Sequence, residues 1–141
     1  MKDFNNKNIL ITGGASGIGK LMAQEFLKRG AHVIIWDIDN AKLEAVKIEL
    51  SDKGKVFTYN LNIADQENIK AAYVAVMNEH KQVDVLINNA GIVLGKYFHE
   101  HSADEIRRTM EINAYAPMFI SHLFLQDMLK VNSGYICNIS S

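Results

Sequence analysis

The chain has 141 residues, of which 48% are hydrophobic and 22% charged, and its formal net charge is -1. These values are typical of one globular domain and give no basic surface for nucleic acid. No apolar run is long enough to span a membrane, no signal peptide is recognisable at the start, and the single cysteine, Cys137, excludes an internal disulfide. We therefore expect a cytoplasmic protein without a nucleic-acid or membrane partner, and a single domain over residues 1–141.

Short apolar runs alternate along the chain with segments whose apolar residues recur at helical spacing. The runs predict five strands, at residues 8–12, 32–36, 56–61, 83–87 and 135–139. The first intervening helix should span residues 17–28, with Gly30 just beyond its end. The second should be capped by Asp39 or Asn40 and end at Gly54.

Two further helices are predicted in the second half of the chain. Asp65 should cap one of them, and the spacing of Ser102 and Glu105 predicts a capping box that begins a long helix. The only proline, Pro117, lies within this long helix and should end or kink it locally. Residues 114–129 are apolar on more than one face. Burial in the core alone would explain this pattern, but we favour contact with a second subunit as well as with the sheet. The strict alternation of strands and helices predicts an α/β fold with a parallel sheet covered on both faces.

A glycine-rich turn, TGGASGIG at residues 12–19, joins the first strand to the first helix. Glycines let the backbone approach phosphate oxygens, and the following helix N-terminus offers unpaired N–H groups and a positive dipole end. Gly14 and Gly19-Lys20 also approach P-loop spacing, but a P-loop needs Ser or Thr next to hold Mg²⁺, and Leu21 stands there. A dinucleotide site is therefore the stronger interpretation.

Asp37 ends the second predicted strand, 24 residues after Gly13. Dinucleotide-binding folds place a carboxylate ~20 residues beyond the glycine turn, where it accepts hydrogen bonds from the adenosine ribose hydroxyls. A carboxylate at this place would repel a 2′-phosphate, and neither Lys nor Arg stands at Ala15, Ser16 or Ile38 to bind one. We therefore expect NAD(H) as the cofactor, in preference to NADP(H).

Four motifs occur in the order found in the short-chain dehydrogenase/reductase family. The turn at residues 12–19 fits TGxxxGxG, residues 88–91 match NNAG, Glu111-Ile112-Asn113 looks like the helix asparagine, and residues 137–141 look like the serine strand. The chain thus resembles the N-terminal portion of such an enzyme over essentially its whole length. The resemblance implies a Rossmann-type doubly wound parallel sheet of order 3-2-1-4-5, with at least one further strand beyond the fifth. The strand end Ile35-Trp36-Asp37 is also similar to members acting on retinoids and steroids.

The resemblance assigns cofactor contacts to three parts of the chain. It implies that the residues surrounding the pyrophosphate are Gly13, Ser16, Gly17, Ile18 and Gly19. It implies that the ribose and nicotinamide lie along Asn89, Ala90 and Gly91, although a plain strand-terminating turn would have a similar composition. Near the adenine, where the family commonly has an aspartate, this chain has Asn62, followed by Ile63.

The resemblance also implies catalytic roles. Asn113 aligns with the asparagine that helps to hold the proton-relay water, and Ser141 aligns with the serine that hydrogen-bonds the substrate oxygen. The family's Tyr-x-x-x-Lys should follow beyond Ser141. Inside the chain, tyrosines with no lysine four residues later stand at Tyr59, Tyr73, Tyr97 and Tyr115, and Tyr135 belongs to the fifth strand. We therefore expect a truncated chain that lacks its acid/base and is inactive alone.

Two functional hypotheses remain open from the sequence. The first is an NAD(H)-dependent oxidoreductase that interconverts a small-molecule alcohol and a carbonyl, acting at full length as a homodimer or homotetramer. The alternative is a nucleotide-binding module or pseudoenzyme that ends at Ser141. No metal site is expected, because His99 and His101 flank Glu100 without another ligand at suitable spacing.

Overall fold

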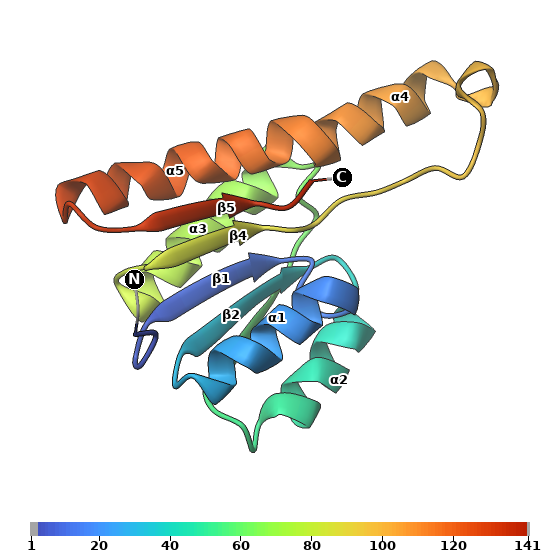
Figure 1. Cartoon of the computed structure of the whole chain (residues 1–141). Helices are drawn as coiled ribbons and strands as arrows, with labels where there is room; N and C mark the ends of the chain where they lie inside the picture. The colour runs from blue at the N-terminus through green and yellow to red at the C-terminus, as the bar shows by residue number, and fades with distance from the viewer. Residues whose placement is uncertain (1–2, 141) are drawn as a thin grey trace.

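The computed structural model of the chain describes residues 3–140. Its strands form one parallel five-stranded sheet in the order β3-β2-β1-β4-β5 (Figure 1). The strands are β1 (Asn8–Thr12), β2 (His32–Asp37), β3 (Val56–Asn60), β4 (Val85–Asn88) and β5 (Tyr135–Asn138). The predicted Rossmann-type α/β class and its strand order are therefore confirmed. Since all the strands are parallel, their carboxyl ends lie at one edge of the sheet.

Helices cover both faces of this sheet, as Figure 1 shows. The α-helices are α1 (Gly17–Lys28), α2 (Asn40–Leu50), α3 (Gln66–His80), α4 (Ala103–Met110) and α5 (Ala116–Lys130). Helices α1 and α2 pack on one face and α3 and α5 on the other. A short 3₁₀ turn, η1 (Phe98–Glu100), precedes α4.

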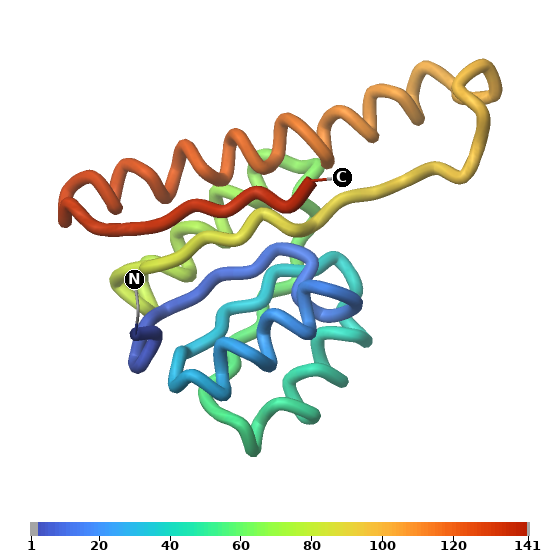
Figure 2. The backbone as a smooth tube through the Cα atoms, viewed as in Figure 1, coloured from blue at the N-terminus to red at the C-terminus, as the bar shows by residue number. Residues whose placement is uncertain are grey.

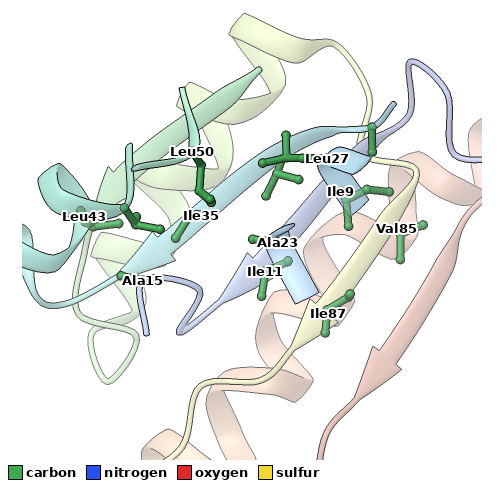
Figure 3. Close-up of a cluster of buried hydrophobic side chains, with 13 residues drawn as sticks. Ile9, Ile11, Ala15, Ala23, Leu27, Ile35, Leu43, Leu50, Val85 and Ile87 are labelled. Atoms are coloured by element: carbon green, nitrogen blue, oxygen red, sulfur yellow. The ribbon is translucent and has the colours of Figure 1, made fainter. Parts of the chain in front are cut away.

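Alternate residues of the central strands supply two separate cores. Ile9, Ile11 and Ile35 face α1 and α2, where Figure 3 shows them among Ala23 and Leu27 of α1 and Leu43 and Leu50 of α2. The opposite core contains Leu10, Ile34 and Leu86 from the strands, and α5 presents a stripe to it at every fourth residue, namely Ala116, Ile120, Phe124 and Met128. Burial on both faces explains why these strands are continuous apolar runs in the sequence.

The predicted helix starts are confirmed by their caps. The Asp39 carboxylate accepts a hydrogen bond from the backbone N–H of Lys42 at the start of α2. Asp65 caps α3 in the same way, and Ser102 and Glu105 form both bonds of the predicted capping box at α4. The side chains of Asp39, Asp65 and Ser102, the last together with Glu105, therefore fix where α2, α3 and α4 begin.

Several predicted ends differ from the structure by a few residues. Strand β3 ends at Asn60 and β5 at Asn138, because Leu61 and Ile139 each contribute only a final ladder hydrogen bond through the backbone N–H. Strand β4 spans 85–88 where 83–87 was predicted. Helix α2 ends at Leu50, before Gly54, because the Ser51 hydroxyl donates to the Ile48 carbonyl and turns the chain.

The long predicted helix is interrupted just before its proline. Helix α4 passes into a π-helical turn, η2 (Glu111–Tyr115), and α5 then begins, with Pro117 in its first turn. Across η2 the Ala116 N–H donates to the Glu111 carbonyl five residues earlier. The predicted local break is thus confirmed, but Pro117 starts a helix instead of ending one, because its missing N–H is not needed there. Within residues 3–140, no helix is long and apolar enough to cross a membrane.

Candidate functional site

A cleft of about 310 Å³ opens at the carboxyl edge of the sheet. Eight of the predicted cofactor-binding residues line it: Gly13, Ser16, Asp37, Asn62, Ile63, Asn89, Ala90 and Gly91. They lie at or just after the ends of strands β1 to β4. From β1 the chain builds the sheet first toward β2 and β3 and then, on the other side of β1, toward β4 and β5, and these residues gather where the direction changes. Open parallel sheets bind their ligands at this point, so the topology and the residue pattern indicate the same site.

The glycine turn packs so closely on its surroundings that side chains do not fit at two positions. Gly13 has a φ of +65°, and a Cβ there would lie 3.0 Å from the Ala90 Cα. A Cβ on Gly19 would lie only 2.3 Å from the Gly13 carbonyl oxygen. The Gly13 N–H donates to the Trp36 carbonyl at 2.7 Å, which fixes the turn to the end of β2. The glycines therefore let this turn pack directly against the start of α1 and the turn after β4, and Gly13 lines the cleft.

The N-terminus of α1 adjoins this turn without a side-chain cap. Ser16 is the N-cap residue, but its side chain makes no capping hydrogen bond, and the first turn carries no acidic residue. The N–H groups of that turn, with the positive end of the helix dipole, are suited to an anion. Lys20, which a P-loop would direct to phosphate, instead pairs with Glu49 at 2.6 Å. The local geometry therefore favours backbone recognition of a pyrophosphate.

Asp37 is held at the mouth of the cleft by backbone donors. Its Oδ2 accepts from the Ala15 N–H at 3.1 Å and its Oδ1 from the Asp39 N–H at 3.1 Å. No Lys or Arg of the described residues forms an ion pair with it. Each oxygen keeps lone-pair capacity for another donor, so the carboxylate can accept hydrogen bonds from a pair of hydroxyl groups.

The turn after β4 is fastened to the glycine turn by a buried threonine and an amide. The Thr12 Oγ1 accepts from the backbone N–H groups of Asn89 at 3.0 Å and Ala90 at 3.1 Å. The Asn89 side chain donates back to the carbonyls of Thr12 and Gly13, at 3.1 and 3.2 Å. Asn89 thus holds the two turns together. Thr12 was not singled out from the sequence, although a polar residue at the end of an apolar strand was a usable signal.

Asn62 and Ile63 follow β3 and form the far wall of the cleft. The Asn62 Oδ1 accepts from the Ala64 N–H at 3.0 Å and so shapes its own turn. An aspartate could accept the same hydrogen bond, since either side chain has an oxygen at this position. The chain's departure from the family's usual aspartate is therefore compatible with the same local backbone.

Asn113 lies in η2 and is bonded to the segment after β4. Its Oδ1 accepts from the Ile92 N–H at 2.8 Å and its Nδ2 donates to the Ile92 carbonyl at 2.7 Å. The same segment is joined to α4 further along by the Lys96–Glu105 ion pair, and Figure 2 shows the two running alongside each other. Asn113 does not itself line the cleft but positions Ile92, which does. Because Pro117 has no N–H, the Asn113 carbonyl lacks its α-helical donor.

The remaining predicted site residues lie apart from the cleft wall. Gly17, Ile18 and Gly19 do not line it, and the Ile18 side chain is 64% exposed, so its contact with the pyrophosphate stays a prediction. Ser141 lies outside the described residues. Lining residues that the sequence analysis missed are Trp36, Ile38, Leu61, Ile92, Arg108 and Ile112. Arg108 and Ile112 are four residues apart on α4–η2, and no motif in the sequence marks them as site residues.

No tyrosine is among the described residues that line the cleft. Burial, together with the hydrogen bond that its hydroxyl donates to Asp127, raises the pKa of Tyr73 to about 12. Burial and the Glu79 carboxylate likewise raise the pKa of Tyr59. A phenol that exchanges protons near neutral pH needs a lowered pKa, so neither tyrosine is suited to acid/base catalysis. Within residues 3–140, no three His, Cys, Asp or Glu side chains gather to hold a metal ion.

Comparison with known proteins gives matches over almost the whole chain. A family model described as short chain dehydrogenase matches residues 7–141. Retinol dehydrogenase 10 of Rattus norvegicus is 33% identical over 158 residues, which cover 94% of this chain and 46% of that protein. Estradiol 17-beta-dehydrogenase 11 of Pongo abelii is 33% identical over 141 residues, which cover 99% and 47%. The chain therefore spans about half the length of the curated relatives that it matches.

Solved structures share the fold closely. A metagenomic short-chain oxidoreductase in complex with NADP has a TM-score of 0.92 at 29% identity, covering 98% of this chain and 63% of that chain. A short-chain dehydrogenase from Streptomyces avermitilis has a TM-score of 0.88 at 29% identity, covering 100% and 51%. The glycine turn, the asparagine turn packed on it and the family match over residues 7–141 agree with one another, and this chain belongs to the short-chain dehydrogenase family.

Proposed function

We propose that the protein is an NAD(H)-dependent oxidoreductase that interconverts an alcohol and a carbonyl by hydride transfer. The observation that carries this proposal is the cleft at the carboxyl edge, where the glycine-rich turn, the uncapped start of α1 and the Asp37 carboxylate follow one another. A pyrophosphate and the adjoining adenosine ribose need these groups in this order. When bound, the nicotinamide ring supplies the carbon that accepts or gives the hydride.

In that reaction, the residues of this chain bind the cofactor and orient the cofactor and the substrate. The N–H groups at the start of α1 bind the pyrophosphate, and Asp37 accepts from the ribose hydroxyls. The backbone of 89–91 lines the nicotinamide half, and Asn113 keeps that backbone in place through Ile92. The Asn113 carbonyl, without its helical donor, can hold a water that relays the proton, and Ser141 hydrogen-bonds the substrate oxygen. The acid/base itself belongs to a Tyr-x-x-x-Lys segment that these 141 residues do not contain.

For the substrate we propose an alcohol or carbonyl on a large apolar carbon skeleton. Support comes from the names of two relatives, a retinol dehydrogenase and an estradiol 17-beta-dehydrogenase. The strand end Ile35-Trp36-Asp37, which is similar to family members acting on retinoids and steroids, supports the same substrate class. An oxidation assay of the longer protein, with retinol and estradiol set against short secondary alcohols, tests the proposal. Preference for the short alcohols would contradict the substrate class and leave the cofactor proposal untouched.

For the cofactor we expect NAD to bind more tightly than NADP, because the Asp37 carboxylate would face the 2′-phosphate. The family does not decide this choice, since one structural relative is in complex with NADP. Asp37→Ala should shift the ratio of the two dissociation constants toward NADP by about tenfold or more, given ~1.5–3 kcal/mol for hydrogen bonds to a charged group. Calorimetric titration with both cofactors measures the ratio, and Asp52→Ala at an exposed carboxylate is the control. Tighter binding of NADP to the unmodified protein would contradict the proposal.

For assembly we expect a homodimer or homotetramer formed through the outer face of α4–α5. Apolar side chains stand exposed along it, with Met110 58%, Met118 71% and Leu129 64% exposed. A two-fold axis would bury this stripe against its own copy. Light scattering of the longer protein at micromolar concentration should give a multiple of its single-chain mass, and Met118→Lys should lower the measured mass. Val93→Lys, at a loop residue that is 91% exposed, is the control; a monomeric mass for the unmodified longer protein would rule the interface out.

A further inference from the structure

One cationic side chain of the cleft has no role in the function proposed above. Arg108 is the only Lys or Arg among the described residues that line the cleft. Its neighbour Arg107 points elsewhere and pairs with Asp104 at 3.5 Å. No hydrogen bond or ion pair engages the Arg108 guanidinium within residues 3–140. An uncommitted guanidinium at the wall of a ligand cleft is available to the ligand.

The place of Arg108 in the cleft identifies the part of the ligand that it meets. Arg108 lies one helical turn before Ile112, which is 6% exposed, so both side chains belong to the face of α4–η2 that borders the cleft. The wall on the β3 side is formed by Asn62 and Ile63. Gln66, three residues after Ile63, lines a neighbouring hollow together with Arg107 and Glu111, so α4–η2 lies beside the segment that follows β3. Arg108 and Ile112 are therefore on the side of the cleft where Ile63 lies.

The adenosine ribose fixes the direction in which the adenine extends. Its hydroxyls are bound at Asp37, at the end of β2, and the pyrophosphate lies on the β1 side of that carboxylate, at the glycine turn. The base and the pyrophosphate leave the ribose at opposite ends. The base must therefore extend to the β3 side, toward Ile63 and the guanidinium of Arg108.

We propose that Arg108 is a further cofactor-binding residue, and that its guanidinium lies flat against the adenine; this inference rests on the proposed function. A planar, weakly hydrated guanidinium stacks on a flat π-system, whereas an ammonium group is a strongly hydrated point charge. Ile63 offers an apolar surface to the base from the β3 side. The adenine is then held between an apolar side chain and a cation, with no base-specific hydrogen bond required.

The test compares three variants by calorimetric titration with NAD and with AMP, which carries the adenine half alone. Arg108→Ala should weaken the binding of both ligands by the same factor, about fivefold to tenfold, as a cation–π contact of this kind implies. Arg108→Lys should recover little of this loss, because lysine keeps the positive charge but has no planar guanidinium to stack on the adenine. Arg107→Ala is the matched control: it removes the adjacent arginine from the same helix and breaks only an exposed ion pair. It should leave both affinities unchanged.

Several results would overturn the inference. These are unchanged affinity in Arg108→Ala, full recovery in Arg108→Lys, a loss for NAD without a loss for AMP, and an equal loss in Arg107→Ala. In each case the unmodified chain binds NAD, so the proposed function stands while the role of Arg108 fails. If the folded, unmodified chain binds neither ligand, the proposed function fails, and the inference fails with it.

Discussion

The 141-residue chain, produced alone, should bind NAD but oxidise retinol, estradiol and short secondary alcohols at least about a hundredfold more slowly than a version extended through a Tyr-x-x-x-Lys segment. Loss of a positioned general acid/base typically removes ~10² to 10⁴ in rate. An unperturbed phenol has a pKa of about 10 and needs a neighbouring positive charge to act near neutrality. No tyrosine of this chain has a lysine four residues later, and the pKa values of Tyr59 and Tyr73 are shifted upward instead.

Two measurements on one sample check this expectation. Calorimetry reports NAD binding, and the absorbance of NADH reports turnover. Binding without turnover is the expected result, because the residues placed around the pyrophosphate and ribose all lie within 13–91. Turnover comparable with that of the extended version would contradict it and would place an acid/base among residues 1–141. Tyr115→Phe and Tyr135→Phe would then test whether the group is one of these two exposed tyrosines.

The fold could be predicted from the sequence because several local signals agreed. Residues such as Ile9, Leu10 and Ile11 are 0% exposed in β1, so the strand has no solvent face and its sequence is a plain apolar run. Polar caps at Asp65 and Ser102 then marked the helix starts. The predicted ends of strands and helices differ from the observed ends by a few residues. A last ladder hydrogen bond or a serine turn moves such an end without a change in the composition of the segment.

The candidate site could be predicted where its residues form compact motifs or, like Asp37, end a strand at a characteristic distance from such a motif. The glycine turn and the turn after β4 are compact motifs, and both line the cleft. Arg108 and Ile112 come from a helix whose position over the cleft depends on packing, and no local pattern separates them from other helix residues. The bonds of Asn113 to Ile92 span 21 residues, so the positioning role of its side chain became visible only in the fold. The π-turn that presents Asn113 was likewise not predicted.

Gly19→Ala should reduce the affinity for NAD by more than tenfold and also destabilise the fold. The added Cβ would lie 2.3 Å from the Gly13 carbonyl oxygen and 2.7 Å from the Asn89 Nδ2, so the backbone of the turn must move. Such overpacking costs ~1–3 kcal/mol. The same movement disturbs the hydrogen bond from Asn89 to the Gly13 carbonyl, which holds the two turns of the cleft together at 3.2 Å.

Urea unfolding and NAD calorimetry, carried out together on two further variants, separate a defect of the site from a general loss of folding. Gly95→Ala meets no atom within 4 Å and should match the unmodified chain in both measurements. Gly17→Ala also meets no atom, but its φ of +54° should cost about 1–2 kcal/mol of stability through strain. If Gly17→Ala keeps its affinity for NAD while Gly19→Ala loses it, the loss comes from the contact with Gly13 and not from lowered stability. Equal affinities in all three variants would show that the glycine turn does not form the pyrophosphate site.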